Sequence, residues 1–378
     1  MGLGHASRLV SIASYLNKDY KARFSSYGEA VPYVKMNGYE CLRVPPVEFV
    51  WSSDSGFSVK RSLAQLPLWL SNFRKQILAE IKNMSSFAPN VVVSDSRLSP
   101  IISAKILSMP SIVILNQIKL LLSPRLRQFS AARLFEKLNG EFMGLFWNKS
   151  DRMVAPDLPP PYTISEDNLW DCDATSKKIE YVGFVVPHNI MYADNLTKVA
   201  VDVGLDRSKP IVFIHISGPK QTRLSLLSTI IESAKSTTQI QWVASEGRPD
   251  GSTTPTKLAP NILYYEWCPI KDELFALSDL VIIRGGHTII SQAIMYGKPM
   301  IVIPIQNHGE QLGNATKVEK LGIGIKLTSN NIQNEQIIEA VNLALNSSKF
   351  LEKSKKVKNI ADKYNGIERT SEIIRQYL

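Results

Sequence analysis

The strongest constraint on the fold is an alternation of two patterns along the whole chain. Short β-branched runs recur between longer segments with the period of an amphipathic helix. This alternation is typical of parallel sheets flanked by helices, so we predict an α/β protein. The expected strands are 23–26, 39–44, 91–94, 111–115 and 152–155 in the first half, and 211–216, 240–244, 261–265, 280–283, 300–303 and 324–327 in the second.

Two domains are expected, because each half carries enough strands for its own doubly wound sheet and 378 residues suffice for two cores. A proline-rich stretch precedes Pro187, where we place the boundary. The predicted domains are residues 1–186 and 187–378, with a last helix able to pack back on the first domain. The chain begins at a glycine loop that normally follows a strand, so the first strand of the N-terminal domain is expected to be absent.

Composition excludes several classes of protein. Apolar residues make up 44% and charged residues 21%, which rules out disordered and collagen-like chains. The amino terminus lacks the features of a signal peptide, and three scattered cysteines and five histidines lack metal-site spacing. We therefore expect a cytoplasmic protein without a metal. The net charge of +10 suits an anionic membrane or a phosphorylated substrate, whereas no nucleic-acid-binding signature accompanies it.

A glycine loop opens the chain and leads into a predicted helix. Its residues are Gly2, Gly4, His5 and Arg8, with other residues between them. Such a loop lets a substrate approach the backbone, and the amino terminus of a helix favours anionic groups. A tight turn with His5 as a helix cap is the alternative explanation.

Two strand-to-helix turns in the second half could receive phosphates through their backbone amides. One follows strand 211–216 and the other follows strand 280–283, so both are expected at the ligand-binding edge of one sheet. A diphosphate is the natural ligand of such a pair. The residues of the two turns are Ser217, Gly218, Arg284, Gly286, His287 and Thr288.

Two further segments suit the other parts of a nucleotide sugar. Trp267 and Ile270 follow strand 261–265 and could contact a base, although a buried strand end would explain them equally. Glu310 and Gln311 follow strand 300–303, and their two-sided hydrogen-bonding capacity is what sugar hydroxyls require.

Taken together, these motifs resemble the donor-binding signature of GT-B glycosyltransferases. They are closest to the MurG-like (family 28) and UDP-glucuronosyltransferase-like (family 1) groups, and the opening loop resembles the acceptor-side loop of the same enzymes. The motifs are Trp267-x-Pro269, Arg284-Gly285-Gly286, Ala293-x-x-x-Gly297-x-Pro299, Glu310-Gln311-x-x-Asn314-Ala315, Gly322-x-Gly324 and Gly2-x-Gly4-His5-x-x-Arg8. The resemblance implies two Rossmann-like domains facing a central cleft.

The resemblance also implies a donor, most often a UDP-sugar, held mainly by the C-terminal domain. The diphosphate would lie near the two turns, the base near Trp267 and Ile270, and the sugar near Glu310 and Gln311. Relatives place a ribose-binding glutamate where this chain has Gln292, whose amide is a neutral acceptor. The resemblance therefore implies a preference for uridine less strongly than it implies the fold.

The implied reaction is an inverting, metal-independent transfer of N-acetylglucosamine or another hexose to an acceptor hydroxyl. His5, or a nearby carboxylate such as Asp95, would remove the acceptor proton, and Arg284 or His287 would stabilise the leaving diphosphate. Besides the UDP-sugar co-substrate no cofactor is expected. The alternatives are a UDP-sugar 2-epimerase and a catalytically idle subunit that binds a nucleotide sugar.

Residues 117–147 combine apolar and basic side chains, with no acid between Lys119 and Phe135. Basic amphipathic helices dock on anionic lipid surfaces, whereas a core-packing helix pair with solvated arginines gives the same pattern. The stretch and the net charge together predict a lipid-linked acceptor and an enzyme peripheral to the inner membrane face.

Overall fold

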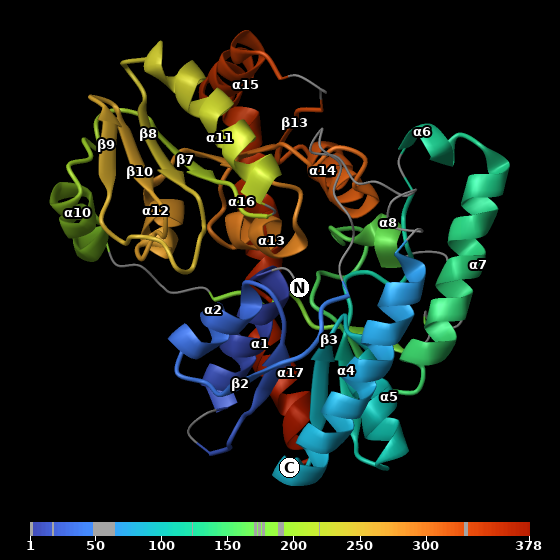
Figure 1. The fold of residues 1–378 in the computed structure, drawn as a ribbon. Helices are drawn as coiled ribbons and strands as arrows, with labels where there is room; N and C mark the ends of the chain where they lie inside the picture. Colours follow the sequence, from blue (N-terminus) through green and yellow to red (C-terminus); the bar gives the residue numbers. More distant parts are fainter. Residues whose placement is uncertain are drawn as a thin grey trace. The chain divides into compact units, whose positions relative to one another are not determined.

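Parallel sheets flanked by helices form both halves of the chain in the computed structural model (Figure 1). The structure describes residues 3–16, 19–47, 65–122, 124–169, 172, 175, 178–187, 193–218, 220–328 and 332–378. The chain divides into two units. Unit 1 comprises Met1–Val186, Asn307–Gly313 and Tyr364–Leu378, and unit 2 comprises Pro187–Gln306 and Asn314–Lys363.

Unit 1 contains two parallel sheets in its described residues. One has four strands in the order β3 (Val92–Asp95), β4 (Ser111–Ile114), β5 (Arg152–Ala155) and β6 (Ile179–Tyr181). The other pairs β1 (Phe24–Ser26) with β2 (Cys41–Arg43). The helices are α1 (Leu3–Leu16), α2 (Ala30–Met36), α4 (Leu66–Phe87), α5 (Leu98–Ile106), α6 (Pro124–Arg127), α7 (Ser130–Trp147), α8 (Glu166–Leu169) and α17 (Gly366–Arg375).

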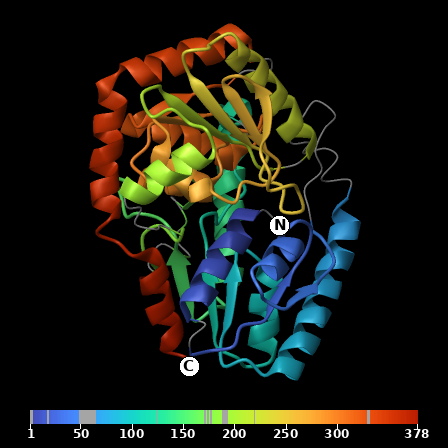
Figure 2. The ribbon, with the colours of Figure 1, turned by 90° about the vertical axis from the view of Figure 1, so that its left-hand side faces the viewer.

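Strand β4 shows why the four-stranded sheet forms where it does. Its residues are apolar apart from Ser111 and all are buried, as expected for a central parallel strand covered on both faces. Ile112 and Ile114 point to the face covered by α1 and α17, and Val113 points to the face covered by α5 and α7. Helices α1 and α17, from opposite ends of the sequence, therefore pack side by side (Figure 2).

Unit 2 contains one seven-stranded sheet in the order β13-β12-β11-β7-β8-β10-β9. Its strands are β7 (Ile211–His215), β8 (Gln241–Ser245), β9 (Thr256–Ala259), β10 (Ile262–Tyr265), β11 (Leu280–Ile283), β12 (Met300–Val302) and β13 (Gly324–Lys326). Only the edge strand β9 is antiparallel within the described sheet. The helices are α10 (Ala193–Asp202), α11 (Lys220–Lys235), α12 (Lys271–Leu277), α13 (His287–Met295), α15 (Asn334–Asn346) and α16 (Ser348–Ala361). Helix α14 (Gly309–Leu321) begins in unit 1, which includes residues up to Gly313, and continues in unit 2.

The strand order of unit 2 reverses between β7 and β11. From β7 the chain proceeds through β8 to β10 on one side, and then returns to β11 on the other side of β7. Open α/β sheets bind ligands at such a switch point, outside the carboxyl ends of the strands. The two glycine turns predicted to receive phosphates follow these two neighbouring strands.

Candidate active site

In unit 1, the first turn of α1 meets the carboxyl end of β3. His5 and Arg8 lie three residues apart, so they share one face of the helix. His5 Nδ1 is 2.7 Å from Asp95 Oδ1, and Arg8 Nε donates to Asp95 Oδ2 at 2.7 Å. Asp95 is the last residue of β3, so the strand end carries this carboxylate directly to α1.

Arg8 extends the cluster to the end of the neighbouring strand. Its Nη2 donates to Asp95 Oδ1 at 3.0 Å and to Asn116 Oδ1 at 2.8 Å. Asn116 follows β4, which pairs with β3 in parallel, so the two side chains leave the same edge of the sheet. Arg8 is thus buried between two acceptors that the sheet fixes in place.

Nδ1 of His5 lies 2.7 Å from Oδ1 of Asp95 and 2.8 Å from Nη2 of Arg8, so the partners of Arg8 bear on which nitrogen of His5 carries a hydrogen. Nη2 of Arg8 has two hydrogens, which Asn116 and Asp95 accept. A bare Nδ1 on His5 would place its lone pair 2.7 Å from the carboxylate of Asp95, whereas a protonated Nδ1 forms a charge-assisted bond there. We therefore assign the hydrogen to Nδ1, which leaves Nε2 of His5 able to accept a proton.

Asp95 is held as an anion by its neighbours. Burial alone would raise the pKa of Asp95, but the charges of Arg8 and His5 and their hydrogen bonds outweigh burial and lower that pKa below its usual value. Its side chain is 0% exposed, whereas that of His5 is 29% exposed. A hydroxyl from solvent can therefore reach His5, while Asp95 only orients it.

Glu310 joins this cluster through Asn116. Asn116 Nδ2 donates to Glu310 Oε1 at 2.9 Å. Both residues belong to unit 1, because Asn307–Gly313 group with that unit. Glu310 and its neighbour Gln311, which the sequence assigns to the donor-binding domain, therefore belong to unit 1 together with His5 and Asp95.

In unit 2, a buried network holds the turn after β7. Gly218 has φ +117°, a conformation that side chains of L-residues rarely adopt. The carbonyl of Gly218 accepts from Arg223 Nη1 at 3.1 Å, and Arg223 Nη2 donates to Glu246 at 3.0 Å. Tyr264 donates to the second oxygen of Glu246 at 2.7 Å. The carbonyl of Gly218 is thus linked through Arg223 of α11 and Glu246 to Tyr264 of β10.

Arg284 brings a buried positive charge to the turn after β11. Its Nη2 donates to the carbonyl of Thr222 at 2.7 Å and its Nη1 to the carbonyl of Ile303 at 3.3 Å. Burial lowers the pKa of Arg284 to about 10, so the group remains charged at neutral pH. In the described part of the chain it forms no ion pair, and its Nε has no acceptor. An anion at the switch point would complete this environment.

The side chain of Gln292 forms a hydrogen bond with a neighbouring helix. It is buried in α13, and its Nε2 donates to Asp272 Oδ1 of α12 at 2.5 Å. Trp267 and Ile270 lie in the connection from β10 to α12, partly exposed, with Ile270 as the residue that precedes the helix. The side chain of Gln292 thus holds the carboxylate of Asp272 beside this segment.

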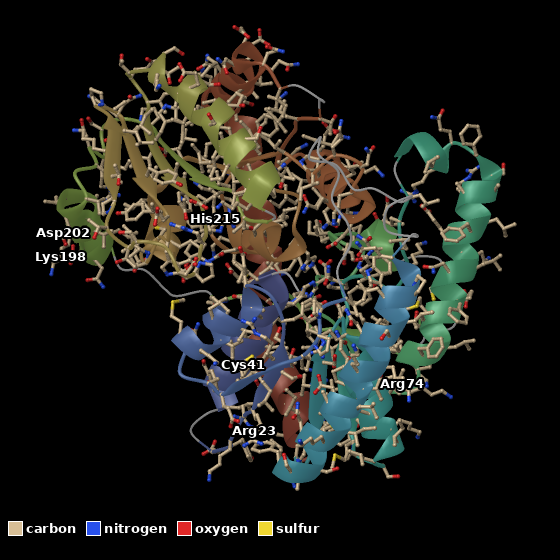
Figure 3. The ribbon with its side chains drawn as sticks, viewed as in Figure 1. Arg23, Cys41, Arg74, Lys198, Asp202 and His215 are labelled. Atoms are coloured by element: carbon tan, nitrogen blue, oxygen red, sulfur yellow. The ribbon has the colours of Figure 1, made fainter. Side chains whose placement is uncertain are left out.

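His215 is the last residue of β7 (Figure 3). Its buried Nδ1 has no hydrogen-bond partner among the described residues. Burial lowers its pKa to about 3, and the charges of Lys271 and Arg223 act in the same direction. Between pH 6.5 and about 3 the unfolded chain binds a proton that the folded chain does not. The free energy of unfolding should therefore fall as the pH drops through this range.

We expect this loss to approach about 1 kcal/mol for each pH unit below 6.5. The measurement is urea unfolding of the wild type and of His215→Phe at several pH values, with fluorescence of the tryptophans as the probe. The variant should show a shallower dependence on pH. Equal slopes for both proteins would mean that His215 titrates normally in the folded state.

Comparison with known proteins shows which proteins share this sequence and fold. Residues 225–370 match the glycosyltransferase family 28 C-terminal domain. An uncharacterized glycosyltransferase of Methanosarcina mazei is 25% identical over 380 residues, covering 99% of this chain and 96% of the relative. The crystal structure of CalG4, the calicheamicin glycosyltransferase, has a TM-score of 0.67 at 15% identity and covers 100% of this chain and 96% of its own. The chain is a glycosyltransferase of the GT-B fold.

A third relative shares a smaller part of this glycosyltransferase. The UDP-N-acetylglucosamine--N-acetylmuramyl-(pentapeptide) pyrophosphoryl-undecaprenol N-acetylglucosamine transferase 2 of Bacillus cereus is 27% identical over 205 residues, covering 53% of this chain and 55% of the relative. The resemblance to MurG-like enzymes found in the sequence is therefore confirmed.

The glycosyltransferase gathers its predicted site residues in two sets. His5, Arg8 and Asp95 meet in unit 1. The expectation of a glycine loop at this point is wrong for the described residues, because α1 already begins at Leu3 and Gly4, His5 and Arg8 are helical. Gly2 lies outside the described residues. In unit 2, the two turns flank the switch point, with Gly286 preceding α13 and His287 and Thr288 in its first turn.

Sequence reasoning missed several polar partners of these residues. They are Asn116, Arg223, Glu246 and Asp272. Asn116 follows a strand end in the same way as Asp95, so the same rule could have found it. In the described part of the glycosyltransferase, no three His, Cys, Asp or Glu side chains gather as a metal ion would require.

Proposed function

We propose that this glycosyltransferase moves a hexose, with N-acetylglucosamine as the first candidate, from a UDP-sugar to an acceptor hydroxyl with inversion at the anomeric carbon. The observation that carries the proposal is the contact of His5 with the buried carboxylate of Asp95. A histidine oriented by a buried anion is suited to general-base catalysis. The name of the Bacillus cereus relative supports the choice of donor.

On the acceptor side, His5 Nε2 would accept the proton of the attacking hydroxyl. The oxygen then forms a bond to the anomeric carbon while the bond from that carbon to the UDP oxygen breaks, and its electron pair leaves on UDP. The proton stays on His5 as an imidazolium, which the charge of Asp95 stabilises. Arg8 keeps Asp95 ionised and fixed, so it acts as a positioning residue.

On the donor side, unit 2 would bind the nucleoside diphosphate at the switch point. Backbone N–H groups in the first turns of α11 and α13 are suited to phosphate oxygens, and Arg284 supplies a buried positive charge that can stabilise the departing diphosphate. We expect this group to serve without a metal ion. Asp272, held by Gln292, is our candidate for the ribose hydroxyls, because a carboxylate accepts from both.

The acceptor is proposed to be lipid-linked, with the enzyme peripheral to the cytoplasmic membrane face. Supporting this, α7 turns an apolar face outward that consists of Leu134, Phe135, Leu138, Phe142 and Leu145, each between 48% and 61% exposed. The residues that α7 buries are Glu136, Gly140, Gly144 and Trp147. The exposure of these five side chains supports the lipid-surface interpretation over the core-packing one. No helix among the described residues is long and apolar enough to cross a bilayer.

Replacing Gln311 with alanine should weaken binding of the UDP-sugar several-fold while leaving the affinity for UDP unchanged. The amide of Gln311 is assigned to sugar hydroxyls, and one hydrogen bond to a neutral group is worth about 0.5 to 1.5 kcal/mol. Calorimetric titration with UDP and with UDP-N-acetylglucosamine, both in excess EDTA, measures the difference. Equal weakening of both ligands would contradict the assignment, and binding that requires a divalent cation would contradict the metal-free donor site.

The same preparation distinguishes transfer from epimerisation. Incubation with UDP-N-acetylglucosamine and no acceptor should leave the sugar unchanged, since the proposed reaction needs an acceptor hydroxyl. Appearance of the 2-epimer would favour an epimerase. Binding of UDP-sugar without turnover toward any lipid extract or soluble acceptor would favour an idle subunit.

A further inference from the structure

Asn116 connects two charged side chains of unit 1. Its Oδ1 accepts from Arg8 Nη2 at 2.8 Å, and its Nδ2 donates to Glu310 Oε1 at 2.9 Å. An arginine can only donate hydrogen bonds and an ionised carboxylate can only accept them, so both contacts require the same orientation of the amide. A flipped amide would turn its NH2 group to Arg8 and its oxygen to Glu310, and both contacts would then be repulsive. The two partners therefore lock the side chain of Asn116.

Glu310 thereby lies at one end of a hydrogen-bonded chain of side chains whose other end is His5. Between them lie Asn116, Arg8 and Asp95, none of which is more than 2% exposed. Solvent reaches the chain at its ends, because the His5 side chain is 29% exposed and Glu310 is partly exposed. Each hydrogen bond in such a chain polarises the next, so the charge of Glu310 makes the Asn116 oxygen a better acceptor for Arg8.

The charges of this chain match a protonated His5. Arg8 is its permanent cation, and Asp95 and Glu310 are its two carboxylates. The chain is therefore negative overall while the imidazole is neutral, and it becomes balanced when the imidazole accepts a proton. Asp95 favours the imidazolium by direct contact, and Glu310 favours it through Asn116 and Arg8.

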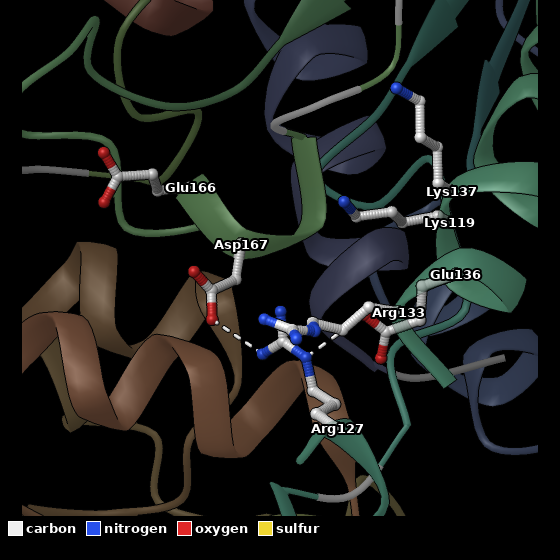
Figure 4. Close-up of a pocket in the computed structure, with 7 residues that line it drawn as sticks. All are labelled: Lys119, Arg127, Arg133, Glu136, Lys137, Glu166 and Asp167. Atoms are coloured by element: carbon white, nitrogen blue, oxygen red, sulfur yellow. Dashed lines mark hydrogen bonds and ion pairs between the residues drawn. The ribbon is translucent and has the colours of Figure 1, made fainter. Parts of the chain in front are cut away.

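A second arginine of unit 1 shows the same set of charges in contact with solvent. Arg127 lies 3.1 Å from Glu136 and 3.0 Å from Asp167, as the dashed lines in Figure 4 show. The side chains of Arg127 and Asp167 are 32% and 40% exposed, so water screens the excess negative charge. The Arg8 side chain is only 2% exposed, and its chain ends in a histidine. The comparison favours a role in accepting a proton for the buried chain.

We propose that Asn116 and Glu310 are positioning residues for the general base. Asn116 joins Glu310 to Arg8, and the carboxylate of Glu310 stabilises the proton that His5 Nε2 accepts from the attacking hydroxyl. The inference rests on the proposed role of His5, and it adds a second role to Glu310, which the sequence assigns to sugar hydroxyls. In the described part of the chain the second oxygen of Glu310 accepts no hydrogen bond, so the two roles are compatible.

Three variants separate the charge of Glu310 from the hydrogen bonds of Asn116. E310Q removes the charge but keeps an oxygen that can accept from Asn116. N116L keeps the charge but removes both hydrogen bonds of the amide. The swapped pair N116D/E310Q restores charge and hydrogen bonds together, because the new amide at position 310 donates to the new carboxylate at position 116, which accepts from Arg8.

Turnover should follow these changes while donor binding does not. E310Q and N116L should each lower kcat roughly tenfold, and the swapped pair should return to within about threefold of wild type, since hydrogen bonds with charged partners are the strong ones. The affinity for UDP, measured by calorimetry, should stay the same, because the donor turns belong to unit 2. If Glu310 served sugar hydroxyls alone, E310Q would raise KM for UDP-N-acetylglucosamine at unchanged kcat, and N116D would not rescue it.

The hydrogen on Nδ1 of His5 provides a measurement that needs no substrate. A proton held between an imidazole and a carboxylate resonates at low field in the proton NMR spectrum, and its loss in His5→Ala identifies it. The resonance should be present in wild type and in the swapped pair. In E310Q and N116L it should shift or broaden, because Arg8 then holds Asp95 less firmly.

Two controls carry matched substitutions elsewhere in the chain. D167N removes one of the two carboxylates that contact Arg127, as E310Q removes one from the chain of Arg8. N261D changes an amide that donates to three backbone carbonyls and precedes β10 in unit 2. Both controls should keep the turnover and the low-field resonance of wild type, although N261D should lower Tm.

Three outcomes would overturn the inference: a wild type without the low-field resonance, an E310Q variant with the resonance and kcat of wild type, or a swapped pair no more active than E310Q. If N116L failed to fold, E310Q and the swapped pair would still decide, because they preserve the sizes of the side chains. The resonance is recorded without donor or acceptor, so a missing transferase activity would contradict the proposed function and leave the result on this chain of side chains standing.

Discussion

Replacing His5 with alanine is expected to lower turnover by roughly 10²- to 10⁴-fold, the usual contribution of a general base. The affinity for UDP should not change, because the donor turns are built from unit 2. Thermal unfolding should change little, since the imidazole is 29% exposed and Arg8 still neutralises Asp95. Steady-state release of UDP, with calorimetry on the same protein, measures both quantities.

A matched control lies on the same helix. Ser14 of α1 is exposed and contacts only Tyr39 through its side chain in the described structure, so Ser14→Ala should keep wild-type turnover. If His5→Ala retained full turnover, His5 would not be the base. If it lost UDP binding and turnover together, the effect would lie in folding or donor binding instead of proton transfer.

Replacing Asp95 with asparagine is expected to cost about 3 to 5 kcal/mol of the free energy of unfolding, because the substitution leaves Arg8 as a buried charge without a counter-ion. Turnover should also fall, since an amide cannot stabilise the imidazolium of His5 as a carboxylate does. Chemical denaturation at neutral pH measures the first effect, and release of UDP under conditions where the variant is folded measures the second.

An exposed pair provides the comparison for this cost. Arg23 Nε contacts Glu40 at 2.9 Å, and the Glu40 side chain is 56% exposed. Glu40→Gln should therefore cost less than about 1 kcal/mol. Replacing Arg8 with methionine together with Asp95→Asn should recover part of the lost stability, because no charge then remains buried. If Asp95→Asn lowered the free energy of unfolding no more than Glu40→Gln does, the ion pair of Arg8 and Asp95 would not be desolvated.

The sequence predicts most strands because buried parallel strands are recognisable one at a time. Strand β11 is Leu-Val-Ile-Ile and is buried throughout, so its composition alone reveals it. The sequence does not predict strands β6 and β9, and the reason is physical. Each strand contains a charged residue and lies at the edge of its sheet, and all of its residues are partly or fully exposed. Edge strands form because a neighbour offers hydrogen bonds, which no local pattern records.

The candidate site shows a similar limit. Rules for strand ends place Asp95 at the ligand edge of its sheet, but His5 lies 90 residues away and their contact depends on how α1 packs. Burial of Arg8 could not be expected either, because arginine is rarely buried without a specific partner. In α7 the usual rule fails outright: the helix buries Glu136 and Gly140 and exposes leucines, so periodicity identifies the helix but not its buried side.

The packing of α1 against α17 has a consequence for how the protein is made. Ile12 and Leu16 of α1 share one core with Ile373 and Ile374 of α17, so this part of unit 1 is completed only by residues near the end of the sequence. During translation, unit 2 emerges from the ribosome before α17, so the apolar side of α1 stays uncovered until α17 has been made. We would therefore look for chaperones bound to the amino-terminal helix of nascent chains, released only once α17 has been synthesised.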